Sequence, residues 1–186
     1  MKTKLVLAVI LAGMMSFAAC DNAKKTAADA AIKGAQTAYA AVADQANQYV
    51  PDQAKDTQTA IQSAKDAFDK GDYAGAFEAS KALPEKVKAL AAAAAAKKDE
   101  LTAKWTEMSG SMPGLVTAVE TKVNALTKSH KLPAGAADSL ASIKQSWSDA
   151  SAAFSSGQLS DAMAKASAAK AKLTELQTTL GMKPAA

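Results

Sequence analysis

Histidine and cysteine, the side chains best suited to nucleophilic and acid–base catalysis near neutral pH, are almost absent from this chain of 186 residues. The sequence holds a single histidine, His130, and a single cysteine, Cys20. Nucleophilic catalysis needs a base within hydrogen-bond reach of a serine, threonine or cysteine. His130 stands at a predicted helix end beside Lys131, where we expect it to be solvated and to interact with the last carbonyl groups of that helix. We therefore expect no catalytic residues and no enzyme activity.

Met108, Met112 and His130 are weak candidates for a metal site. Thioether and imidazole groups could hold copper or form an axial pair on haem. The sequence lacks the Cys-x-x-Cys-His motif that attaches haem, and methionines four residues apart are common in loops. We therefore expect no metal and no cofactor.

The remaining polar and aromatic candidates fit structural roles better than chemical ones. Trp105 and Trp147 could line a ligand pocket, but they lie on or beside predicted apolar faces, which favours a place in the core. The carboxylates are not paired on apolar faces. We expect solvated surfaces and helix caps for Asp66, Asp69, Asp72, Asp99 and Glu100.

The N-terminal segment has the order of a secretory signal. Lys2 and Lys4 precede an apolar run, and small residues then lead to Cys20. Phe17-Ala18-Ala19-Cys20 resembles the lipobox of bacterial lipoproteins, with Phe17 in the place where leucine is usual. In that family the cysteine is diacylated and becomes the new N-terminus. The resemblance implies a signal peptide at 1–19, lipidation at Cys20 and a lipidated tether at 20–24.

A lipid on Cys20 would place the protein on a membrane that faces the periplasm. Each buried methylene of an acyl chain contributes about 0.8 kcal/mol, so two or three chains would hold the protein firmly. The apolar run of the signal is too short for an ordinary membrane-spanning helix. Asp21 resembles the inner-membrane retention signal of enteric lipoproteins, which favours the inner membrane and leaves the outer membrane as an alternative.

The near-neutral charge and the lack of arginine argue against nucleic acid as a partner. Of the 22 basic residues, Lys2 and Lys4 fall in the predicted signal, so the mature chain carries 20 lysines against 18 acidic residues. The chain has no arginine, the residue best suited to bidentate contacts with phosphate or guanine. We expect no nucleic acid as a partner, and we expect the membrane and an envelope protein instead.

Apolar residues recur at alternating spacings of three and four along six segments, which predicts an all-α fold of antiparallel helical bundles without strands. One such segment carries Leu159, Ala162, Ala166, Ala169, Leu173, Leu176 and Leu180 on a single helix face. A shift of 86 residues superimposes the pattern of 54–94 on that of 140–180. The six helices are therefore predicted to form two three-helix repeats.

The predicted domains are a first repeat at 25–108, a loop at 109–114 and a second repeat at 115–182. A long third helix from Asp72 towards Met108 is predicted to join the repeats, and Pro84 either kinks this helix or restarts it. In each repeat a turn centred on Gly71 or Gly157 reverses the chain. Asp72, or less clearly Ser156 or Gln158, could cap the helix that follows.

The phrase Ala-Phe-x-x-Gly-Asp-Tyr-x-x-Ala around Gly71 resembles the turn of tetratricopeptide-like hairpins and of small periplasmic helical bundles. The period of this chain is not that of tetratricopeptide repeats, so the resemblance concerns geometry alone. Two function classes follow. The first is an anchored, non-enzymatic adaptor, spacer or protein-binding module of the cell envelope. The alternative is a carrier that holds a small apolar ligand or cofactor between its helices.

Overall fold

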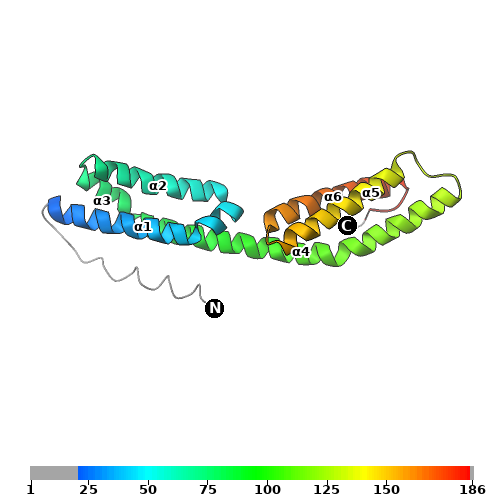
Figure 1. Ribbon diagram of the computed structural model, residues 1–186, viewed down its shortest axis with the longest axis horizontal. Coiled ribbons are helices and arrows are strands. Elements are labelled where there is room, and N and C mark those ends of the chain that lie inside the picture. Colours follow the sequence, from blue (N-terminus) through cyan, green and yellow to red (C-terminus); the bar gives the residue numbers. More distant parts are fainter. Residues whose placement is uncertain (1–20, 185–186) are drawn as a thin grey trace. The chain divides into compact units, whose positions relative to one another are not determined.

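A computed structural model describes residues 21–184 of the chain, and within this range the fold is all-α, as predicted, with no strand. Figure 1 shows the helices in chain order, with these bounds: α1 (Asp21–Tyr49), α2 (Pro51–Asp69), α3 (Tyr73–Lys81), α4 (Leu83–Lys128), α5 (Ala136–Ser155) and α6 (Leu159–Thr179). None of the helices in the described range combines the length and apolar character needed to cross a membrane.

The chain divides into two compact units within α4. Unit 1 is Met1–Lys97 and unit 2 is Lys98–Ala186. In unit 1, buried residues of α1, α2, α3 and the start of α4 form the core: Ala28, Ile32, Ala35, Ala46, Ala54, Ile61, Ala64, Ala76, Leu83, Val87, Leu90 and Ala94. Many of these side chains are alanines, which have little volume, so these cores form between closely packed helices.

Unit 2 has a core of larger side chains. Buried residues of α4, α5 and α6 form it, together with Leu180, which follows the end of α6: Met112, Val119, Val123, Ala136, Leu140, Ile143, Ala169, Leu173, Leu176 and Leu180. The seven residues predicted to share one face of the last helix are all buried. The three-and-four spacing thus identified the buried face of α6 correctly.

Pro84 restarts a helix, which is one of the two outcomes predicted for it. α3 ends at Lys81 and α4 begins at Leu83, with Ala82 in a turn between them. As the second residue of α4, Pro84 lies in the first turn, where a missing N–H removes no intrahelical hydrogen bond. The predicted third helix is therefore divided, and its larger part belongs to α4.

The predicted loop at 109–114 is wrong, because these residues lie inside α4. Two glycines and one proline cost a helix about 5 kcal/mol relative to alanine, which is why this composition is typical of loops. Trp105, Met112 and Val119 are buried in or beside this stretch, and each buried side chain of this size contributes about 2 kcal/mol. Tertiary packing therefore outweighs local propensity here.

The path of α4 changes the predicted division into domains. The two units separate between Lys97 and Lys98, and the predicted boundary at 109–114 lies inside unit 2. At the other end of the chain, residues 21–24 of the predicted tether belong to α1. The signal peptide at 1–19 and the lipidation site Cys20 lie outside the described residues.

Candidate functional site

The three candidate metal-binding residues do not form a common site. Met112 is fully buried, and Met108 packs against the same core one turn earlier in α4. His130 follows the end of α4, eighteen positions after Met112, which corresponds to roughly 27 Å of helix. The structure thus brings the two methionines together and leaves the imidazole far from them. Within the described range, no three His, Cys, Asp or Glu residues group as a metal site would require.

His130 ends α4 through its backbone. Its φ of 55° is left-handed, and its N–H donates to the carbonyl of Thr127 at 3.1 Å. The next N–H, of Lys131, donates to the carbonyl of Leu126 at 2.9 Å. This pair of bonds is the Schellman pattern, in which glycine usually occupies the place of His130. The prediction of an exposed residue at a helix end is correct, and the contact with the last carbonyls comes from the backbone N–H.

The carboxylates that the sequence assigned to surfaces and caps have local partners. Asp72 accepts a hydrogen bond from the N–H of Gly75 at 2.8 Å and so caps α3, as predicted.

Other carboxylates of this group have partners on their own helices. Asp66 accepts from the Gln62 amide at 2.6 Å, and Glu100 pairs with Lys104 at 2.6 Å. Asp69 pairs with Lys65, and this hydrogen bond raises the pKa of the lysine. These contacts are short-range and exposed, as expected of a solvated helix surface.

Three aromatic rings stack where α4 lies beside α5. The ring of Trp105 is nearly parallel to that of Trp147, with centroids 5.5 Å apart, and to that of Phe154, with centroids 4.5 Å apart. Trp147 and Phe154 are seven residues apart on α5, which places them on one face with a rise of about 10.5 Å. The Trp105 ring therefore fits between them. It is 7% exposed, so its predicted place in the core is confirmed, whereas Phe154 is 37% exposed.

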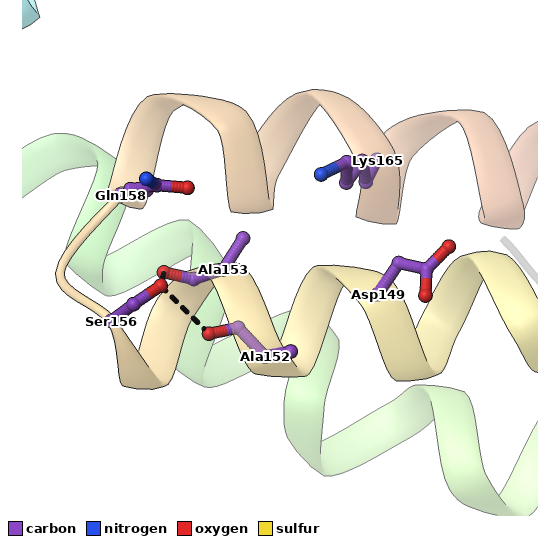
Figure 2. Close-up of a pocket in the computed structure, with 6 residues that line it drawn as sticks. All are labelled: Asp149, Ala152, Ala153, Ser156, Gln158 and Lys165. Carbon is purple, nitrogen blue, oxygen red and sulfur yellow. Dashed lines mark hydrogen bonds between the residues drawn. The ribbon is translucent and has the colours of Figure 1, made fainter.

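A surface hollow of about 290 Å³ lies on the α6 side of α5, near the turn that joins the two helices (Figure 2). Its lining combines two alanines with a carboxylate, a hydroxyl, an amide and an amine: Asp149, Ala152, Ala153, Ser156, Gln158 and Lys165. Figure 2 shows Asp149 on α5 and Lys165 on α6 at one end of the hollow, with Ser156 and Gln158 at the turn.

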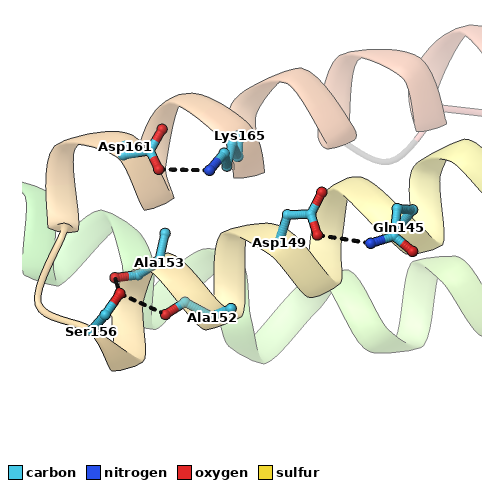
Figure 3. A network of polar contacts seen from close by, with 7 residues as sticks. All are labelled: Gln145, Asp149, Ala152, Ala153, Ser156, Asp161 and Lys165. Carbon is cyan, nitrogen blue, oxygen red and sulfur yellow. Dashed lines mark hydrogen bonds and ion pairs between the residues drawn. The ribbon is translucent and has the colours of Figure 1, made fainter.

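The polar groups around the hollow are held mainly by partners on their own helices (Figure 3). Asp161 accepts from Lys165 at 2.6 Å, and this bond, with the nearby charge of Asp149, raises the pKa of the lysine. Asp149 accepts from the Gln145 amide at 2.8 Å. The Ser156 hydroxyl donates to the carbonyls of Ala152 and Ala153 at 2.9 and 3.0 Å. The hollow therefore offers polar groups that already have partners.

Sequence reasoning did not identify this hollow. The sequence predicts Ser156 and Gln158 only as candidate helix caps, and neither caps α6: Gln158 stands at the cap position without a side-chain cap bond, and Ser156 bonds back to α5. The 86-residue shift contains a signal that could have marked the region. It aligns Asp149 with Ser63 and Lys165 with Ala79, so the charged groups occur only in the second copy.

Comparisons with protein-family models, with characterised proteins and with solved structures find no match to this chain.

Proposed function

We propose that this chain is a lipid-anchored, non-enzymatic protein of the cell envelope that acts as a helical adaptor, spacer or protein-binding module. The observation that carries the proposal is Cys20, the one cysteine of the sequence, directly after Phe17-Ala18-Ala19. α1 begins at Asp21, so in this proposal the helical body follows the lipid-bearing residue without a linker. Asp21 itself favours the inner membrane, with the body facing the periplasm.

The polar surface supports a role without catalysis. Lysines and carboxylates pair on their own helices, as Lys33 does with Asp29 at 2.8 Å and Lys104 with Glu100 at 2.6 Å. Such pairs stabilise exposed helices and fix no geometry for a substrate. A catalytic site instead needs a nucleophile and a base held in hydrogen-bond reach of each other.

The packing favours an adaptor over a carrier. In unit 1, Ala46, Ala54 and Ala94 are fully buried together, and alanine seams bring helices close instead of lining a cavity. The hollow beside Lys165 is a surface feature with exposed charged walls. A carrier of an apolar ligand would bury its cargo against apolar side chains, so this function stays the alternative.

The two units are, in this proposal, copies of one three-helix repeat. The 86-residue shift aligns α2 with α5, and it aligns α3 and the start of α4 with α6. The turns agree in detail, because Gly71 and Gly157 have φ of 83° and 79° and donate to Phe68 and Phe154 at 3.0 and 2.9 Å. One long helix, α4, would then serve as the last helix of the first copy and the first helix of the second.

Metabolic labelling with an alkyne-bearing fatty acid in bacterial cells tests the anchor. We expect the wild-type chain to take up the label and to sediment with membranes, and Cys20→Ser to lose both properties. Asp21→Ser is the matched control, because it keeps the cysteine and tests only the choice between inner and outer membrane. An unlabelled wild-type chain in the soluble periplasmic fraction would contradict the proposal.

Native mass spectrometry of the protein released from detergent separates the adaptor from the carrier. We expect the mass of the lipidated chain with no further small molecule. A bound molecule of constant mass would favour the carrier, and its mass would identify the cargo.

A further inference from the structure

We propose that residues 98–108 of α4 form a strap that opens and closes within unit 2. The Trp105 ring holds the strap in its closed position, and residues 109–111 form the hinge at which α4 bends. The closed strap is the arrangement described above, with the Trp105 ring between Trp147 and Phe154. This inference does not depend on the membrane anchor or on the adaptor function.

The strap is attached to the rest of unit 2 mainly through one side chain. Within residues 98–108, Trp105 is the buried residue, while Leu101 and Met108 are partly buried and the rest are exposed. On the other side of the hinge, Met112, Val119 and Val123 belong to the core of unit 2. Lys144 of α5 also pairs with Glu120 of α4 at 2.6 Å. The part of α4 after the hinge is thus held at several points, and the strap chiefly at one.

The hinge is a weak stretch of helix. Pro113 has no N–H, so the carbonyl of Ser109 lacks its usual helical donor. The hydroxyls of Ser109 and Ser111 bond to the carbonyls of Thr106 and Met108 at 3.0 and 3.3 Å, and such bonds compete with the helical backbone. Gly110 adds backbone freedom.

Packing does not require a glycine at position 110. A Cβ added there would meet nothing within 4 Å, so neither close approach nor backbone conformation explains the residue. Its remaining physical effect is to lower the cost of bending α4 next to the buried Met112. Bending there withdraws Trp105 from between the two rings of α5 and presents Trp105, Trp147 and Phe154 as one apolar surface.

The chain has two tryptophans, Trp105 and Trp147, so incorporation of 5-fluorotryptophan into the whole protein gives one fluorine signal for each of the two indole rings of the stack. We expect both signals to show exchange on the microsecond-to-millisecond timescale in relaxation dispersion. Both should exchange at one common rate, because a single opening event changes the surroundings of both rings. Flat dispersion profiles for both signals would overturn the proposal.

Gly110→Ala tests the hinge without risk to folding, because alanine favours the helix. We expect it to lower the population of the open strap about fivefold. Ser111→Gly should raise that population about twofold. Gly34→Ala in α1 is the matched control, since an added Cβ there also meets nothing within 4 Å, and it should leave both signals unchanged. Exchange that does not respond to Gly110→Ala would place the motion elsewhere and overturn the hinge.

Discussion

The turns α2–α3 and α5–α6 share a backbone but use different side chains. In unit 1, Phe68 meets Tyr73 edge-on at 5.2 Å, and Lys25 of α1 lies 5.0 Å from the centre of the Tyr73 ring. In unit 2, Phe154 stacks on Trp105 of α4 instead, and Leu159 stands buried in the place of Tyr73. The glycine and the apolar period determine the turn, while the neighbouring residues determine which helix the turn is tied to.

The largest expected effect tests whether the two turns contribute equally to the free energy of unfolding. Gly71→Val and Gly157→Val each force a β-branched residue into a left-handed conformation, and each should lower the free energy of unfolding by about 2 kcal/mol. Both tryptophans lie in unit 2. Tryptophan fluorescence during urea unfolding therefore follows unit 2, and far-ultraviolet circular dichroism follows both units.

The spectroscopic pattern is as informative as the size of the loss. Gly157→Val should lower the urea midpoint seen by fluorescence, and Gly71→Val should act mainly on the dichroism of unit 1. Gly34→Ala is the control for a glycine without a left-handed φ and should not destabilise either unit. If valine destabilised only one of the two units, the two turns would not be equivalent in stabilising the fold.

The second effect separates the turns by their caps. Asp72 caps α3 through Gly75, whereas Gln158 makes no side-chain cap bond to α6. Asp72→Ala should cost about 1 kcal/mol, while Gln158→Ala should leave stability unchanged within error. Thermal unfolding of the two variants side by side measures the difference. An equal loss in both would mean that the Asp72 bond contributes nothing specific.

The third effect extends the comparison to the end of α4, where His130 holds the position that glycine holds in both turns. His130→Gly should raise the free energy of unfolding by about 0.5–1 kcal/mol, because glycine adopts a φ of this sign without steric cost. Fluorescence-detected urea unfolding reports it, since α4 ends within unit 2. His130→Ala controls for loss of the imidazole and should not stabilise, and a gain in that variant would refute the backbone explanation.

The smallest effect concerns the paired lysines. Asp161 raises the pKa of Lys165 and Asp69 raises that of Lys65, in both cases first through a hydrogen bond. The stabilisation that the raised lysine pKa represents is present below the ordinary lysine pKa of 10.5 and is lost as the pH rises through the higher folded value. Asp161→Asn should lower the pKa of Lys165 and leave that of Lys65 unchanged, as followed by NMR titration of the lysine side chains. A Lys165 pKa that stays raised would assign the shift to Asp149.

The sequence predicted the features that repeat along a single helix and missed the features that depend on contacts between two helices. The three-and-four spacing found the buried face of α6, and the glycines found the turns. The stack was not predictable, because Trp105 and Trp147 lie on different helices and no local pattern pairs them. The hollow joins the exposed faces of α5 and α6, which apolar periodicity does not describe. The loop at 109–114 was predicted wrongly because local composition cannot register the burial of Met112.

Unit 1 and unit 2 share α4, which has a kinetic consequence. Starting a helix costs far more than extending one, with a nucleation factor of about 0.001. α4 is a single helix of 46 residues that crosses the boundary between the units. Whichever unit folds first therefore supplies the other with a helix that only has to be extended. The two cores share one nucleation event. If unit 1 folds first, a substitution that hinders helix formation at 83–97 should therefore also slow the folding of unit 2.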